Sequence, residues 1–138
     1  MSKDNFNRII DSLEIKYVLS NMRKVVRPVE LINTREEKDI IVHVKKGFFS
    51  AGDGIQNNHK QIEEGGFVFI PRDSVINFRH GHGPYDTISS EGFTSPEQRE
   101  RYVKPINPSI GLDDAEHVFN IIAFEVSVYG AVPFFNML

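Results

Sequence analysis

The chain has 138 residues, a length that suits one domain with a substantial hydrophobic core. Its formal net charge of −3 provides no basic surface field, so we expect no direct binding of nucleic acid. The chain has no cysteine, which excludes disulfides, thiolate metal sites and thiol catalysis. The N-terminus lacks an apolar signal core, and no apolar run approaches the ~20 residues of a membrane span. We therefore expect a single cytoplasmic domain over residues 1–138 that does not contact a membrane.

The first 26 residues combine two periodicities. Apolar residues recur at helical spacing from Asp4 to Leu13, with Asp4 as the N-cap, which predicts a short amphipathic helix that covers one end of the fold. From Glu14 to Val26, apolar and polar residues alternate, which is the period of a half-buried strand.

Strand and turn signals follow one another in the next part of the chain. The charged run 33–39 predicts a solvated loop, and the run 40–44 predicts a strand. Asp53-Gly54 indicates a hairpin between a short strand and a returning strand at 59–62.

The run 62–78 is organised as a strand, a turn and a second strand. Gly65 permits a positive φ at the entry to the first strand. Pro71 ends that strand because it donates no backbone hydrogen bond, and Asp73-Ser74 turns the chain.

Regular strand signals fade between Gly81 and His117. Ser95-Pro96-Glu97-Gln98 has a capping hydroxyl followed by proline at the first helical position, which predicts a short helix to about Tyr102. A connection this long commonly serves as a lid, a binding loop or a subunit contact. The run 119–128 predicts a final strand, and the apolar tail after Gly130 predicts packing against a partner or continuation into a further domain.

Eight or so short strands separated by turns predict an all-β barrel or sandwich. Gly65 followed by five residues and Pro71 resembles the second motif of the cupin superfamily. The run 40–47 resembles the cupin strand that ends the first motif at a glycine, here Gly47. The resemblance implies a small cupin barrel, or double-stranded β-helix, with a short N-terminal helix and a short helix in a long loop.

A narrower resemblance involves both ends of the chain. The runs 4–19 and 124–138 are similar to the start and end of the cupin-type sensor domain of AraC-type transcription regulators. By that resemblance the domain binds a small-molecule effector, forms a homodimer and passes the signal to a DNA-binding domain. The chain leaves no room for two helix-turn-helix motifs after Leu138, so we expect an isolated sensor domain whose contact with DNA requires a domain outside this chain.

Metal-binding cupins hold their ion with histidines and a carboxylate at fixed positions in the two motifs. Here Ile40 falls in the acidic slot and Ile76 in the fourth ligand slot, while Thr34 with Glu36, or Asn33 with Arg35, fall in the two histidine slots. Isoleucine offers no donor atom, so a metal-dependent dioxygenase or isomerase is disfavoured. The sensor interpretation predicts a domain that has no metal or other cofactor and is not an enzyme.

The histidines have other interpretations. We interpret His80-Gly81-His82 as a solvent-exposed loop past a strand, because the three or four ligands of a metal site are not close in sequence. His43 is interpreted as a structural histidine on an apolar strand, and His59 and His117 as surface residues.

In the cupin pattern the fourth ligand slot faces the barrel interior. Strand alternation then also turns Phe78 and His80 inward with Ile76, and an inward Ile40 does the same for Val42 and Val44. Glu125 stands among apolar strand residues and is the one carboxylate expected to have access to the barrel interior, so it either pairs or contacts a ligand. The predicted ligand-binding residues are Val42, Val44, Ile76, Phe78, His80 and Glu125. Such an interior suits a hydrophobic or aromatic small molecule, unless the same residues simply fill a closed core.

Two alternatives remain open. A metal-independent small cupin enzyme, of the epimerase or lyase type, requires an acid and a base in the barrel mouth, with His43, Tyr17 and Glu125 as candidates. A dimerisation module with a filled barrel has no such requirement.

Overall fold

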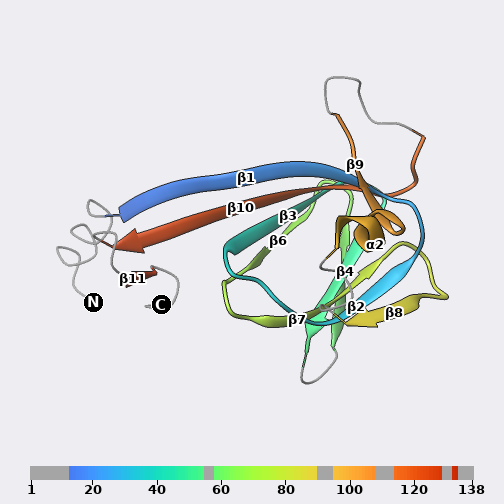
Figure 1. Ribbon diagram of the computed structural model, residues 1–138, viewed down its shortest axis with the longest axis horizontal. Helices are drawn as coiled ribbons and strands as arrows, with labels where there is room; N and C mark the ends of the chain where they lie inside the picture. The colour runs from blue at the N-terminus through green and yellow to red at the C-terminus, as the bar shows by residue number, and fades with distance from the viewer. Residues whose placement is uncertain (1–12, 55–57, 90–94, 108–113, 129–131, 134–138) are drawn as a thin grey trace.

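The computed structural model describes residues 13–54, 58–89, 95–107, 114–128 and 132–133. Two β-sheets and one short helix make up this part of the chain (Figure 1). No helix among the described residues is long and apolar enough to cross a membrane. The strands are β1 (Leu13–Val25), β2 (Val29–Arg35), β3 (Asp39–Lys46), β4 (Phe48–Asp53), β5 (His59–Glu63), β6 (Phe67–Ile70), β7 (Val75–His80), β8 (Asp86–Ser89), β9 (Val103–Pro105), β10 (Val118–Val128) and β11 (Val132–Pro133), and the helix is α2 (Pro96–Glu100).

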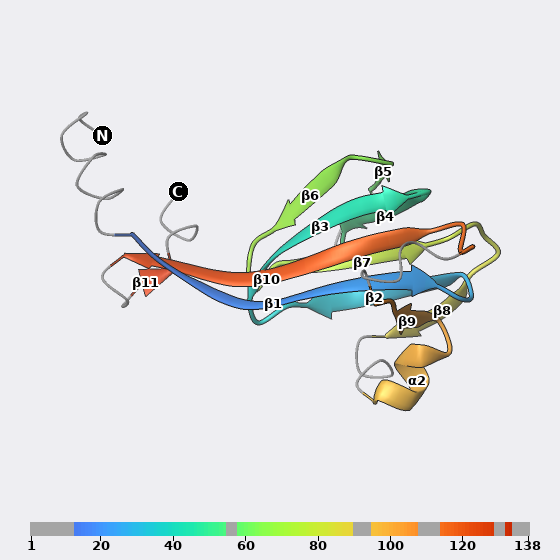
Figure 2. The same ribbon diagram turned by 90° about the horizontal axis from the view of Figure 1, so that it is seen from above.

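The strand order defines the architecture. One sheet has the order β6-β3-β10-β1-β9, with β11 paired to β10, and the other has the order β5-β4-β7-β2-β8. Successive strands from β1 to β4 therefore alternate between the sheets, which lie one above the other in Figure 1 and overlap when seen from above in Figure 2. This is the double-sheet jelly roll that cupins share with several other all-β classes. The expected all-β, cupin-type barrel is confirmed.

Antiparallel pairing holds most of the structure together. The longest ladder joins β1 to β10, from Leu13 opposite Val128 to Lys24 opposite Val118, with a register shift between Tyr17 and Leu19. Within the described ranges, β2 and β8 form the one parallel pair. β10 stays paired with β3 only as far as Phe124 opposite Asp39. Beyond that point β1 and β10 continue as a ribbon that leaves the barrel (Figure 1).

The core lies between the two sheets. Inward side chains alternate along β3, where Ile40, Val42 and Val44 are buried, as the period of two requires. Among the residues whose burial is described, the buried apolar ones are Val29, Leu31, Ile40, Val42, Val44, Phe49, Ile62, Ile70, Phe78, Val103, Val118, Phe119 and Ala123.

Local turn chemistry agrees with the sequence. Gly65 has φ +84°, and Asp73 has φ +66° in the turn closed by Ser74 N–H donating to the Pro71 carbonyl at 3.2 Å. Ser95 caps α2, since its Oγ accepts a hydrogen bond from Gln98 N–H at 3.2 Å. The predicted helix after Ser95 is therefore confirmed, while the predicted helix at 4–13 lies almost wholly outside the described residues.

The structure corrects two expectations about loops. The charged run 33–39 is not all loop, because β2 continues to Arg35 and β3 begins at Asp39. Asn33 adopts φ +55°, at a register shift between β2 and β7, and its N–H donates to the Asn77 side chain at 2.9 Å. Two short strands, β8 and β9, interrupt the long connection between β7 and β10. Their pairing is long-range, so local patterns give little sign of it.

Candidate functional site

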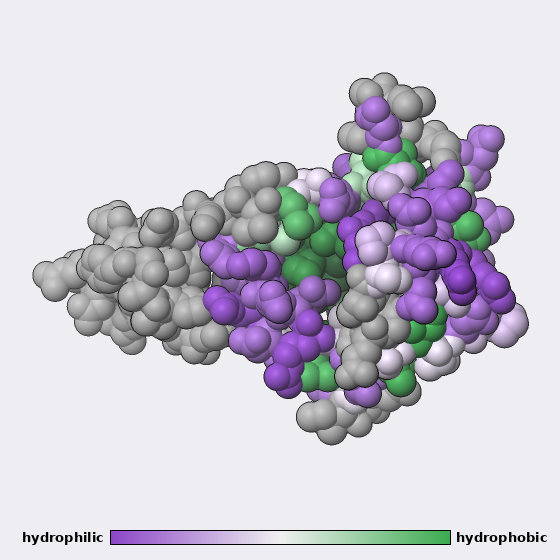
Figure 3. Space-filling view, in the orientation of Figure 1, coloured by the Kyte–Doolittle hydropathy of each residue, from purple (hydrophilic) through white to green (hydrophobic). Residues whose placement is uncertain are grey.

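A cavity of about 770 Å³ opens between the two sheets. The face in Figure 3 is hollowed near its centre, where hydrophobic atoms lie below hydrophilic side chains. A volume of this size is typical of small-molecule pockets. The cavity is lined by Leu19, Arg23, Leu31, Thr34, Arg35, Glu36, Glu37, Lys38, Ile40, Val42, Phe49, Ile70, Phe78, His80, Arg99, Val103, Phe119, Ile121 and Ala123.

Aromatic rings make up much of the cavity interior. Phe49 on β4 lies 5.5 Å from Phe78 on β7 and 6.2 Å from Phe119 on β10, measured between ring centroids. The imidazole of His80 stacks on Phe119 at 4.8 Å with the planes 18° apart. The two sheets thus contribute one continuous aromatic surface, suited to an apolar ligand body.

His80 is the polar exception in that surface. The side chain is buried, and burial lowers its pKa to about 3, with smaller contributions from Arg23 and His117. The imidazole is therefore neutral at physiological pH, so that it contributes one donor and one acceptor to the cavity and no charge.

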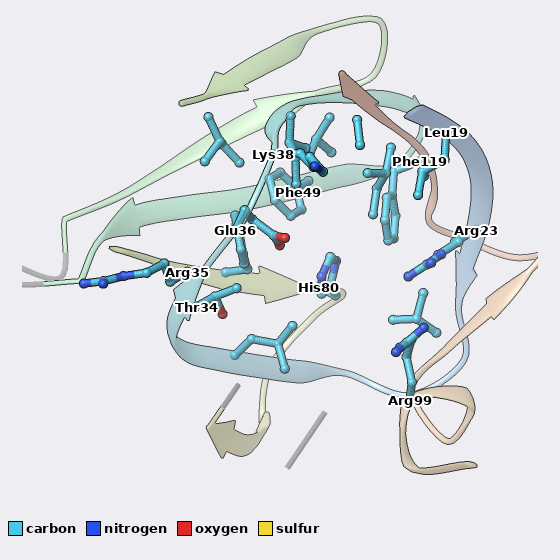
Figure 4. A pocket seen from close by; sticks show the side chains of 18 of the residues that line it. Leu19, Arg23, Thr34, Arg35, Glu36, Lys38, Phe49, His80, Arg99 and Phe119 are labelled. Carbon is cyan, nitrogen blue, oxygen red and sulfur yellow. The ribbon is translucent and has the colours of Figure 1, made fainter. Parts of the chain in front are cut away.

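Charged residues gather around the mouth of the cavity. Arg23 on β1 and Arg99 on α2 point toward the interior in Figure 4, and Glu36 reaches in from the opposite side. Four cationic side chains line the cavity against two carboxylates, and one of the four, Lys38, is paired with Glu125 outside the lining, which leaves three against two. Among the described residues, the Arg23 guanidinium has no carboxylate within ion-pair distance. The mouth therefore has a positive excess that suits a negatively charged group.

The ionisation of these groups reflects their mutual proximity. Burial lowers the pKa of Arg23, Arg99 lowers it further, and Glu36 raises it. Burial raises the pKa of Glu36, against the opposing effect of Arg23. Since two guanidinium groups repel each other across the mouth, a ligand carboxylate or phosphate placed between them would relieve that repulsion.

The rim segment between β2 and β3 is held by backbone contacts. Asp73 N–H donates to the Glu36 carbonyl at 2.9 Å. The buried carboxylate of Asp39 accepts a hydrogen bond from Arg72 N–H at 2.9 Å. The Lys38 ammonium pairs with Glu125. These contacts fix the rim to the neighbouring turn, so the position of Glu36 is set by the fold.

The predicted ligand-binding residues divide into two groups. Val42, Phe78 and His80 line the cavity. Val44 is buried in the core, Ile76 packs against the core, and Glu125 pairs with Lys38, and none of the three lines the cavity. Ligand binding by any of the six stays a prediction.

The charged groups at the mouth were not predicted from the sequence. Arg23, Arg99 and Glu36 come from a strand, a helix in a long connection and a short rim segment. The one available signal was the position of Glu36 in a slot that holds a metal ligand in other cupins. No local sequence pattern indicated that α2 places Arg99 at the same cavity.

The residues named for the enzyme alternative are not assembled in the cavity. Neither His43 nor Glu125 lines it, because His43 lies on β3 between the inward residues Val42 and Val44. Tyr17 belongs to β1, but its side chain lies outside the described residues.

Two interpretations of histidines are wrong. His117 is buried, with 7% of its surface exposed, and His80 is buried rather than part of an exposed loop. His82 is exposed, as predicted. The packing partner of both buried rings is aromatic, Phe48 for His117 and Phe119 for His80, and such pairing is not visible in the sequence.

Comparison with known proteins gives no match to a protein-family model and none to a curated protein. Solved structures do match. A protein of unknown function from Rhizobium leguminosarum bv. viciae 3841 has 8% identity and a TM-score of 0.45, over 81% of this chain and 80% of that one. The polyketide cyclase RemF from Streptomyces resistomycificus has 12% identity and a TM-score of 0.44, over 81% and 64%. The EutQ protein of Clostridium difficile has 13% identity and a TM-score of 0.41, over 81% and 67%. With scores this low, we draw no inference from these proteins, and the fold assignment rests on the strand order.

Proposed function

We propose that this chain is a small-molecule-binding domain whose ligand has an apolar body and one anionic group. The observation that carries the proposal is the open cavity of about 770 Å³ with an aromatic interior and cationic side chains at its mouth. A filled barrel would leave no such space, so the cavity favours a sensor over the pure dimerisation module.

The finer assignment follows the resemblance to AraC-type regulators. In that arrangement the domain reports the effector to a helix-turn-helix domain that binds DNA, and this domain would lie outside the present chain. The positive cavity mouth extends the sequence expectation of a hydrophobic or aromatic effector, since it adds a place for a carboxylate or phosphate.

The experiment uses matched probes that differ in one charge. Octanoate and benzoate carry the carboxylate, and octanamide and benzamide are their neutral counterparts. We expect the carboxylates to raise the midpoint of thermal unfolding of the chain and the amides to raise it less, because only the native state has the cavity. Isothermal titration calorimetry then gives the affinities.

The variant Arg23→Gln tests the proposed anion contact. A hydrogen bond to a charged group contributes about 1.5–3 kcal/mol, so the variant should bind the carboxylates at least about tenfold more weakly and the amides unchanged. Arg101→Gln is the matched control, because Arg101 is exposed and does not line the cavity. Equal affinity for acids and amides, or no binding of any probe, would contradict the proposal.

A further inference from the structure

Three side chains with metal-ligand atoms meet outside the cavity. His82 lies in the connection between β7 and β8, and Glu116 and His117 directly precede β10. One ligand atom from each residue lies within 4.8 Å of the other two. We call these three residues the His82–His117 group.

One member of the group is held rigidly. The ring of His117 packs edge-on against Phe48, with centroids 4.7 Å apart, and Phe48 N–H donates to Nδ1 at 3.3 Å. Gly47 makes this approach possible, since a Cβ there would lie 2.3 Å from the same nitrogen. His117 is thus a ligand whose orientation is fixed before an ion arrives, which lowers the entropic cost of binding.

The other two members can adjust. His82 and Glu116 are exposed, and the ring of His82 lies edge-on to that of His117, with centroids 5.3 Å apart. Ligand atoms on a tetrahedral ion with bonds of about 2.0–2.2 Å are about 3.4 Å apart. The ligand atoms of the group are up to 4.8 Å apart, so an ion requires the two exposed side chains to rotate toward His117.

The buried histidine also has a nitrogen in need of a partner. Within the described residues, Nε2 of His117 is buried and has no hydrogen-bond partner. While Nδ1 accepts the bond from Phe48, Nε2 carries the proton of the neutral ring, and a buried donor without an acceptor costs about 1–3 kcal/mol. Transfer of that proton to Nδ1 gives up the long hydrogen bond from Phe48 N–H and frees the Nε2 lone pair for a metal ion, while the edge-on packing against the Phe48 ring still orients the imidazole.

We propose that the His82–His117 group binds a divalent transition-metal ion, with Zn²⁺ as the preferred ion and water completing its coordination. Two imidazoles and one carboxylate are a common zinc ligand set, whereas Mg²⁺ and Ca²⁺ prefer oxygen ligands alone. The site lies apart from the positions that hold the metal in cupins, and the proposal does not depend on the function of the cavity.

The test uses the full chain without an affinity tag. Calorimetric titration with Zn²⁺ should give one ion per chain and a raised unfolding midpoint, and Mg²⁺ at the same concentration should give neither. Co²⁺ should produce the visible absorption of a tetrahedral nitrogen and oxygen site. Absence of Zn²⁺ binding, or equal binding of Mg²⁺, would overturn the proposal.

Variants at the two exposed ligands locate the site without disturbing the core. His82→Gln and Glu116→Gln should each weaken Zn²⁺ binding about tenfold or more, because each removes one of three ligands. His43→Gln is the control, since it removes a histidine outside the group. Unchanged Zn²⁺ affinity in both ligand variants would show that the ion binds elsewhere and would refute the assignment.

Discussion

His80 shows how one residue links the cavity to stability. Its imidazole packs against both Phe49 and Phe119, with centroids 5.1 and 4.8 Å away, where a charged ring would be poorly solvated. Arg23 from β1 and His117, next to β10, add positive charge nearby. The fold therefore excludes the protonated form of His80, and this exclusion has a measurable consequence.

We expect His80 to make the protein less stable as the pH is lowered. The pKa of His80 is about 3 in the native state and about 6.5 in the unfolded state. Between these pH values the unfolded state therefore binds a proton at His80 and the native state does not. Stability is therefore retained above pH 6.5 and lost as the pH falls toward 3, by about 1.4 kcal/mol per unit, or about 2 kcal/mol at pH 5.

The variant His80→Phe isolates this effect. Phenylalanine keeps a flat ring in the aromatic surface and removes the titrating group. Denaturant unfolding at pH 7.5 and pH 5 should show a loss of stability between the two pH values that is smaller by about 2 kcal/mol in the variant. His43→Gln is the control for removal of a histidine that does not line the cavity. Equal losses in wild type and His80→Phe would contradict a buried neutral His80.

At the scale of single elements, the sequence was informative where a pattern is local. Alternation along 40–44, the Gly65 and Pro71–Ser74 turns and the Ser95 cap all predicted the structure found. Local patterns did not predict the positions that depend on contacts between segments far apart in the sequence. Arg23 and Arg99 meet only because β1, β9 and α2 are brought together, and Glu125 is paired because β10 brings it to Lys38.

The turn between β3 and β4 gives a sharper test of such long-range packing. Gly47 has φ +76°, and a Cβ there would lie 2.3 Å from His117 Nδ1 and 2.5 Å from the Glu116 carbonyl. Gly65 has φ +84°, and a Cβ at that position would meet no atom of the described residues within 4 Å beyond its chain neighbours. The two glycines thus share the backbone conformation and differ in the space around it.

We expect Gly65→Ala to cost about 1–2 kcal/mol, the strain of the left-handed conformation alone. Gly47→Ala should cost about 1–3 kcal/mol more, because the methyl group displaces the buried ring of His117. Urea unfolding with a common m-value measures both. Equal losses in the two variants would mean that the packing of His117 against the turn contributes nothing.

At the scale of the whole molecule, the β1–β10 ribbon is the part of the two-sheet structure that extends beyond the jelly roll. β1 is paired with β10 along its length, but on its other side β9 covers only Arg23 to Val25. In the described part of the chain, the backbone of residues 13–21 therefore has an open edge. A long uncovered edge strand is a template for pairing with another chain.

We propose that two copies of the chain pair along this edge of β1, in keeping with the homodimer that the AraC-type resemblance implies. Light scattering coupled to gel filtration should give twice the chain mass of 15.8 kDa at high concentration. Hydrogen exchange in peptides covering 13–21 should slow as concentration rises, because the outward amides become bonded, whereas β5, an edge strand of the other sheet, should exchange at a constant rate. A monomer at every concentration would refute the dimer, and a dimer with unchanged exchange at 13–21 would place the interface on another surface.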